Sequence, residues 1–171
     1  MLALLAVSCS STGYQNRSAD KLEATDVSLS KCLGNESVVQ SEISTTRAEF
    51  NRAIQEEDTD SIRRVLSENV VLVTGTDSTL IIGRQNQLDI WNEDFTSTDP
   101  LIFNRTPSCI VGSSLYPIAM EHGCWIGAKH NDDINSVSGE YSAKWRRTDQ
   151  SWIIESETYV TTNCSGDLCP R

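Results

Sequence analysis

The stretch AMEHGCWIGAKH, residues 119–130, places a carboxylate, an imidazole, a thiol and an indole within five consecutive positions. It falls in one of several strand-like segments in the second half of the chain. Successive side chains of a strand point to opposite faces of the sheet. We therefore expect Glu121 and Trp125 on one face, and His122 and Cys124 on the other. This geometry disfavours an acid-base pair between Glu121 and His122.

Hydrophobic spacing predicts the elements around this strand. Ile43, Phe50 and Ile54 are seven and four residues apart, as in an amphipathic helix. The predicted order is a helix over 38–57, a short helix containing Ile62, Val65 and Leu66, a hairpin around 74–79, a helix through Leu88, Trp91 and Phe95, and strands near 101–113, 118–130, 134–147 and 151–162. This order predicts an α+β fold with three helices packed on one face of a strongly curved antiparallel sheet.

Composition limits the classes of function. The 171 residues suffice for one domain with a sizeable core. A net charge of -10, with 24 acidic and 14 scattered basic residues, argues against a nucleic-acid partner. The cysteines form no CxxC pair, so we expect no metal site, and no motif predicts a cofactor.

The N-terminal segment, residues 1–9, resembles a bacterial lipoprotein signal that ends in a lipobox with Cys9 as the lipid-bearing residue. A frayed apolar N-terminus is the alternative. Residues 10–37 are polar and read as a disordered tether, followed by a folded domain over 38–163 and a C-terminal tail over 164–171. The resemblance implies anchoring at the periplasmic side of a bacterial membrane, or otherwise secretion. The apolar run is too short for a transmembrane helix.

Several spaced motifs resemble the nuclear transport factor 2-like (NTF2-like) superfamily, which has a cystatin-like fold. They are Ala119-x-Glu121-x-Gly123-x-Trp125, Gly139-x-Tyr141, Trp145-Arg146-Arg147, Trp152-x-Ile154 and the stretch IIGRQNQL at 81–88. Within it, the nearest resemblance is to the family called domain of unknown function 4440, related to the SnoaL-like polyketide cyclases. The resemblance implies a cone whose sheet curls around the helices and leaves a pocket open at one end. Ketosteroid isomerases, scytalone dehydratases and polyketide cyclases use this pocket for proton transfer, whereas other members only bind ligands or dimerise, so fold does not settle function.

The concave face is expected to be aromatic. Pairing the last two strands around residues 148–151 places Tyr141 opposite Thr158, Ala143 opposite Ser156 and Trp145 opposite Ile154, with Lys144 and Glu155 as an ion pair on the other face. The predicted ligand-binding pocket therefore consists of Trp91, Glu121, Trp125, Tyr141, Trp145, Ser156 and Thr158.

Glu121 is the candidate catalytic residue. A carboxylate on an apolar concave face has its pKa raised by desolvation, which suits a general acid or base near neutral pH. The alternatives are a glutamate bonded to a backbone group or helix end, and one at the open rim. Both histidines fall on the face assigned away from the pocket, so no acid-base dyad is recognised.

The cysteines predict disulfides in an oxidising compartment. If the turn between the first two long strands is centred at residues 116–117, Cys109 lies opposite Cys124 and can bridge to it. Cys164 and Cys169 are expected to close a small loop, with Cys32 free or joined to another chain. A reduced, buried Cys124 is the alternative.

Three functions remain open. The preferred one is a non-catalytic domain that binds a small apolar molecule or a protein partner in the periplasm. The second is an isomerase, dehydratase or cyclase-like enzyme that uses Glu121 for proton abstraction next to a carbonyl. The third is a structural module that forms a homodimer through the convex face of the sheet.

Overall fold

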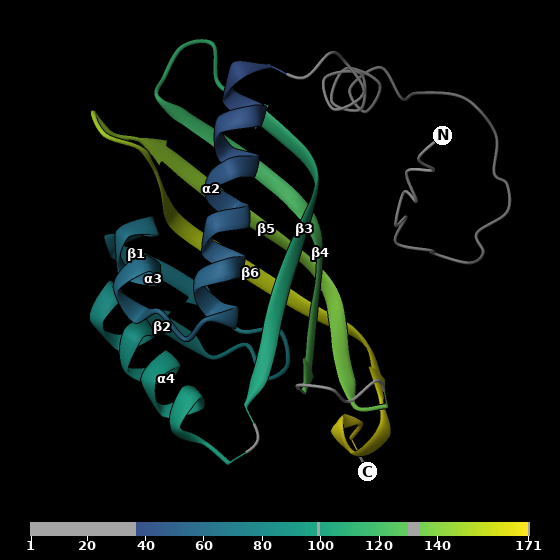
Figure 1. Ribbon diagram of the computed structural model, residues 1–171. Coiled ribbons are helices and arrows are strands. Elements are labelled where there is room, and N and C mark those ends of the chain that lie inside the picture. The colour runs from purple at the N-terminus through teal and green to yellow at the C-terminus, as the bar shows by residue number, and fades with distance from the viewer. Residues whose placement is uncertain (1–36, 99, 130–133, 171) are drawn as a thin grey trace, which may run out of the picture.

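Three helices pack on one face of a six-stranded sheet, whose long strands curl around them (Figure 1). The computed structural model describes residues 37–98, 100–129 and 134–170. The elements are α2 (Val38–Gln55), α3 (Thr59–Val65), β1 (Leu66–Val73), β2 (Leu80–Ile82), α4 (Arg84–Thr96), β3 (Leu101–Gly112), β4 (Ile118–Lys129), β5 (Ser136–Arg147), β6 (Trp152–Ser165) and the 3-10 turn η1 (Gly166–Leu168). The predicted α+β order is confirmed. The predictions for Cys9, Cys32 and the tether lie outside the described residues.

The sequence of α2 contains a capping motif and an apolar stripe, which together explain why it forms a helix. Ser37 and Gln40 form a reciprocal capping box, in which each side chain accepts a hydrogen bond from the other residue's backbone N–H. The predicted apolar stripe of Ile43, Phe50 and Ile54 is buried against the sheet. Arg47 lies in the same stripe and is also buried, which places a cation inside the molecule.

The strand order is β2-β1-β6-β5-β4-β3. Strands β3 to β6 form an antiparallel meander, as predicted, but β1 pairs parallel to β6. The prediction of a wholly antiparallel sheet was therefore wrong at this one pair. Strand β1 lies beside β6, the last strand of the meander, and runs in the same direction.

The predicted faces of β4 are confirmed. Glu121, Gly123 and Trp125 are buried, whereas His122 and Ile126 are exposed. Gly123 is needed here because a Cβ atom would lie 2.2 Å from the carbonyl oxygen of Thr106 and 2.9 Å from the ring of Tyr141. The missing side chain gives the Tyr141 ring room on the inward face.

The predicted register between β3 and β4 was wrong by two residues. Cys109 pairs with His122, because the turn between the two strands is centred one residue earlier than predicted. A bulge between Pro107 and Cys109 shifts the register by one more residue, so that Cys124 pairs with Thr106. Cys109 and Cys124 thus do not lie opposite each other, although each is disulfide-bonded.

A second bulge, in β6, changes which residues face inward. Trp145 pairs with Ile154 as predicted, but Tyr141 pairs with Tyr159 rather than Thr158. The register shifts between Lys144 and Trp145, where Glu155 is the extra residue of β6.

The extra residue reverses the alternation of side chains beyond it. Glu157 and Tyr159 are buried, whereas Thr158 is exposed and Ser156 is only partly buried. The assignment of Ser156 and Thr158 to the concave face was therefore wrong. The predicted outer ion pair is confirmed, with Lys144 Nζ 3.4 Å from Glu155 Oε2.

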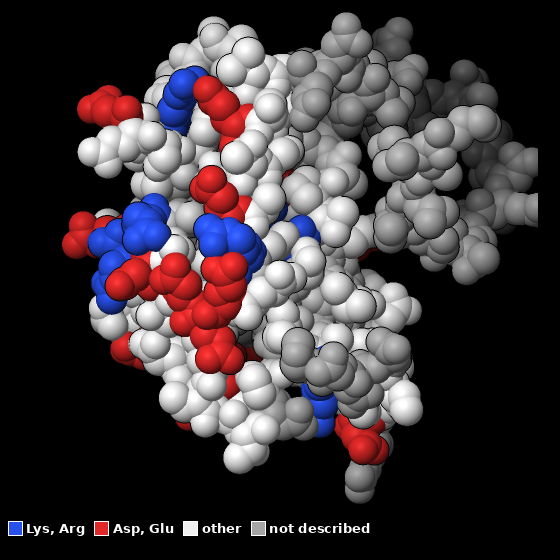
Figure 2. Space-filling model, viewed as in Figure 1, with Lys and Arg blue, Asp and Glu red and all other residues white. Residues whose placement is uncertain are grey.

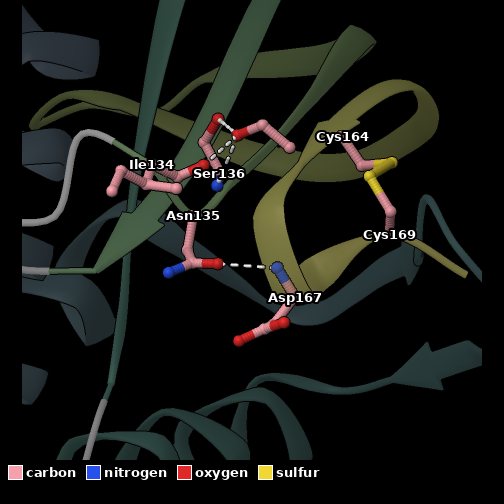
Figure 3. The surroundings of a disulfide bond; sticks show 7 residues. Ile134, Asn135, Ser136, Cys164, Asp167 and Cys169 are labelled. Carbon is pink, nitrogen blue, oxygen red and sulfur yellow. Dashed lines mark hydrogen bonds between the residues drawn. A yellow bond between two sulfur atoms is a disulfide. The ribbon is translucent and has the colours of Figure 1, made fainter.

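The Cys164–Cys169 disulfide is confirmed and closes the chain around η1 (Figure 3). Asn135 fixes this loop, since its Oδ1 accepts a hydrogen bond of 2.7 Å from the backbone N–H of Asp167. Ser136 and Ser165 join their hydroxyls at 3.0 Å, which ties the start of β5 to the end of β6.

Charges of both signs are interspersed on the helical side of the molecule (Figure 2). Arg52 and Glu56 form an exposed pair at the end of α2, and Arg147 pairs with Glu42 across to the sheet. Within the described part of the chain, no helix is long and apolar enough to cross a membrane.

Candidate functional site: a buried charge cluster and an aromatic cavity

Glu121 lies at the centre of a buried charge cluster on the inward face of the sheet. Arg47 Nε donates to Glu121 Oε1 at 3.0 Å, and Arg47 Nη2 donates to Glu121 Oε2 at 3.2 Å. The Tyr141 hydroxyl donates to Oε1, and Trp145 Nε1 donates to Oε2 at 2.5 Å. The two carboxylate oxygens are thus each bound by two donors.

Arg47 carries a second carboxylate partner. Its Nη2 lies 2.9 Å from Glu157 Oε1, a close ion-pair contact without the geometry of a hydrogen bond. Burial acts to lower the pKa of Arg47, but the charges of Glu157 and Glu121 outweigh it and raise the pKa above its usual value. Burial likewise raises the pKa of Tyr141, and the nearby Glu121 carboxylate adds to that effect. Arg47 therefore stays a cation and Tyr141 a neutral hydrogen-bond donor. In these protonation states both residues keep their bonds to the Glu121 carboxylate.

A second buried arginine, Arg105 on β3, lies in a different environment. Its guanidinium carbon is 5.4–5.9 Å from the ring centroids of Phe50, Trp91, Phe103 and Tyr159. Arg105 Nε donates to the Tyr159 hydroxyl at 2.9 Å. Asn51 holds the backbone on both sides, accepting from the N–H of Arg105 and donating to its carbonyl. Among the described residues, no carboxylate pairs with Arg105.

A cavity of about 300 Å³ opens beside Arg105, between α4, the β1–β2 hairpin and the sheet. This volume lies at the lower end of the range for small-molecule sites, roughly 300–1,000 Å³. Its lining is mostly apolar: Leu72, Thr74, Gly75, Thr76, Ile81, Gln87, Ile90, Trp91, Asp94, Leu101, Phe103, Arg105, Trp125, Val137 and Tyr159.

The aromatic residues of the lining form a continuous wall. Trp91 contacts Phe103 edge-on, Phe103 contacts Trp125, and Trp125 contacts Tyr159, with ring centroids 5.9–6.0 Å apart. Helix α4 carries Trp91, and Gly83, the residue before this helix, has a φ of 92° that lets the chain turn from β2 into it.

Two polar side chains of α4 also face the cavity. Gln87 is 3% exposed, and its Nε2 has no hydrogen-bond partner in the described structure. Asp94 is partly buried, and desolvation, with a contribution from Glu93, raises its pKa. Most buried polar atoms in proteins are hydrogen-bonded, so the Gln87 amide nitrogen is an unused donor next to the cavity.

The residues predicted for the pocket therefore separate into three groups. Trp91 and Trp125 line the cavity. Glu121, Tyr141 and Trp145 are buried together on the same face but belong to the charge cluster instead. Ser156 and Thr158 fall outside both.

Sequence reasoning found Glu121 and Tyr141 but missed Arg47 and Glu157 of the charge cluster, and Gln87, Asp94, Arg105 and Tyr159 of the cavity. Arg47 had a usable signal, since it lies four residues after Ile43 and three before Phe50, within the apolar stripe. Glu157 and Tyr159 had none, because the bulge that turns them inward has no marker in the sequence. Nowhere in residues 37–98, 100–129 and 134–170 do three or more His, Cys, Asp or Glu side chains form a metal-binding group.

Solved structures with the same arrangement identify the fold. An NTF2-like protein of unknown function from Pseudomonas putida matches with a TM-score of 0.63 at 16% identity, over 77% of this chain and 96% of that one. A domain of unknown function with a cystatin-like fold from Nostoc punctiforme matches with a TM-score of 0.62 at 12% identity, over 74% and 80%. The fold is NTF2-like.

A third matching structure is a ketosteroid isomerase-like protein from Erwinia carotovora atroseptica, with a TM-score of 0.59 at 12% identity, over 72% of this chain and 95% of that one. The chain matches no protein-family model, and no curated protein is significantly similar in sequence. At these identities the likeness concerns the fold alone. Membership of the domain of unknown function 4440 family stays a prediction.

Proposed function

We propose that this NTF2-like domain binds a small, largely apolar molecule in the cavity beside Arg105. The observation that carries this proposal is the continuous aromatic wall of Trp91, Phe103, Trp125 and Tyr159 around an open volume of about 300 Å³. Buried aromatic surface supplies most of the binding free energy in such sites, and a few polar groups orient the ligand.

A matched pair of valine substitutions tests the proposal. Val137 on β5 lines the cavity, whereas Val160 on the neighbouring strand β6 is 56% exposed on the outward face. Val137→Phe fills part of the cavity, so we expect it to weaken binding of a neutral bicyclic probe, 2-naphthamide, at least tenfold. Val160→Phe makes the same change in volume and should leave the affinity unchanged.

The measurement is isothermal titration calorimetry with the full chain, with melting temperature as the check on folding. Equal affinity of the two variants for 2-naphthamide would show that the probe binds elsewhere. No measurable binding of any bicyclic probe to the unaltered protein would contradict the proposal.

Asp94 favours a second candidate function, proton transfer on a bound carbonyl compound. It is the carboxylate of the cavity lining, and its raised pKa suits a general base or acid. Glu121 is unsuited to this role because both of its oxygens are engaged in the charge cluster. In this reaction the Asp94 carboxylate would take a proton from the carbon next to the carbonyl and return one to the same carbon.

Deuterium exchange distinguishes the two candidates. In D₂O, an enzyme would exchange the protons next to the carbonyl of 2-tetralone faster than buffer does, as measured by NMR. Asp94→Asn should abolish that acceleration, while Asp89→Asn, exposed on the same helix, should not. A rate equal to that of buffer would leave ligand binding as the function.

Two expectations about partners and location stay predictions. Met120, Ile126 and Val160 are exposed on the outward face of the sheet, where a second copy could pack, and sedimentation at several concentrations would test for a dimer. Anchoring through Cys9 at the periplasmic face of a membrane is tested by metabolic labelling with radioactive palmitate.

A further inference from the structure

We infer that the ligand of this cavity is an aromatic carboxylate, whose carboxyl group binds Arg105 and whose ring packs on the aromatic wall. This inference rests on the proposed function and names the class of ligand for the same site. It starts from a buried guanidinium without a counter-charge.

Burial of an unpaired cation is costly, because the protein interior replaces water poorly around a charge. Arg105 is 7% exposed, and its side chain donates hydrogen bonds to the neutral Tyr159 hydroxyl at 2.9 Å and to the Phe103 carbonyl at 3.5 Å. The surrounding rings offset part of the cost by cation–π attraction but carry no net charge. Among the described residues, Arg105 therefore has no carboxylate partner.

The groups next to Arg105 have unused hydrogen-bond donors. Arg105 has guanidinium N–H groups beyond the Nε that binds Tyr159, and Gln87 Nε2 is buried without a partner. The Tyr159 hydroxyl accepts from Arg105 and keeps its own proton to donate. Burial raises the pKa of Tyr159, so the hydroxyl stays protonated, although Arg105 opposes that effect. Three donors without an acceptor fit the two oxygens of a carboxylate, which guanidinium binds in a bidentate manner.

Asp94 does not fill this role. It lines the same cavity but makes no ion pair with Arg105 within 4.0 Å in the described structure. The cavity volume sets the size of the ligand, since about 300 Å³ holds one or two fused rings with a short acidic substituent.

A matched pair of probes tests the inference with the full chain. 2-Naphthoate and 2-naphthamide have the same ring and nearly the same shape, but only the first is an anion. We expect calorimetry to give at least tenfold tighter binding for 2-naphthoate at pH 7. Equal affinities would overturn the inference and leave the proposed function standing, whereas binding of neither probe would overturn both.

Arg105→Met should remove the preference, bringing the two affinities within about threefold, while binding of 2-naphthamide survives. Arg105→Lys keeps the charge without the planar fork and should keep part of the preference. Arg63→Met is the control, because Arg63 is exposed on α3 and the substitution changes the net charge equally. A preference that persists in Arg105→Met would overturn the assignment of Arg105. Should that variant fail to fold, Gln87→Leu and the comparison of probes on the unaltered protein still decide the outcome.

Discussion

Two arginines are buried on the inward side of one sheet, at 1% and 7% exposure, and their surroundings differ in one respect. Arg47 contacts two carboxylates, Glu121 and Glu157, and three aromatic rings. Arg105 contacts four aromatic rings and no carboxylate among the described residues. Removing a buried cation that has counter-charges leaves those charges unpaired and destabilises the fold, whereas a buried cation that lacks a counter-charge beside a cavity is available to a ligand.

The largest effect on stability is expected for Arg47→Met. The substitution leaves Glu121 and Glu157 buried without their cation, which costs about 3–5 kcal/mol when one partner of a buried pair is removed. Urea unfolding measures the free energy of unfolding. Arg52→Met is the control, because its pair with Glu56 is exposed and contributes roughly 0.5 kcal/mol or less. Equal losses in the two variants would contradict a stabilising role for the charge cluster.

Tyr141→Phe should have the next largest effect. It removes a buried hydroxyl that donates to the Glu121 carboxylate, and a hydrogen bond to a charged group is worth about 1.5–3 kcal/mol. The same change at the exposed Tyr116 should stay within about 0.5 kcal/mol in urea unfolding. A loss in Tyr141→Phe as small as that in Tyr116→Phe would show that Arg47 and Trp145 suffice to hold Glu121.

Arg105→Met is expected to change the free energy of unfolding by only about 1 kcal/mol, in either direction. The substitution leaves no buried charge unpaired, and methionine can fill the aromatic surroundings. Urea unfolding without ligand measures it. A loss in the free energy of unfolding as large as that of Arg47→Met would contradict the distinction between the two arginines.

The smallest effect is a difference in pH dependence between two aspartates. Desolvation raises the pKa of Asp94 in the folded state, so the folded protein binds its proton more tightly than the unfolded chain does. The stability associated with Asp94 therefore falls as pH rises above 3.8, the ordinary value, and Asp94→Asn should remove that fall.

The pKa of Asp77, in the β1–β2 turn, shifts in the opposite direction. Hydrogen bonds from Thr74 and Thr79 lower its pKa to about 2. The stability that Asp77 contributes is fully present above pH 3.8 and is lost as pH falls towards 2. Asp77→Asn should therefore destabilise the protein above pH 3.8, and the loss should shrink as pH falls below that value. Urea unfolding between pH 3 and 7 measures both variants. Parallel curves for Asp94→Asn and the unaltered protein would contradict the desolvation of Asp94 beside the cavity.

The elements and most of their faces were predictable because helices and strands repeat with fixed periods. The spacing of Ile43, Phe50 and Ile54 predicted helix α2, and the alternation of side chains along a strand predicted that Glu121 and Trp125 face inward. The failures occur at the β3–β4 turn, which is centred one residue earlier than predicted, and at the bulges, where one extra residue shifts the register. Pro107 marks the bulge in β3, since proline in a strand favours a bulge, whereas the bulge in β6 has no such marker. Arg47 could have been recognised, because a charged residue within an apolar helical stripe is unusual unless it is paired.

The parallel pairing of β1 with β6 has a consequence for how the cavity forms during synthesis. The hydroxyls of Thr76 and Thr161, which join the hairpin to β6, are 85 positions apart in the chain. The wall from β1 and α4 leaves the ribosome early, but it can dock only after β6 has emerged, because β6 is its neighbour in the sheet. Contacts between such distant segments form slowly. Until then Trp91 lacks its contact with Phe103, so the chain exposes aromatic surface, and exposed apolar surface during folding promotes aggregation.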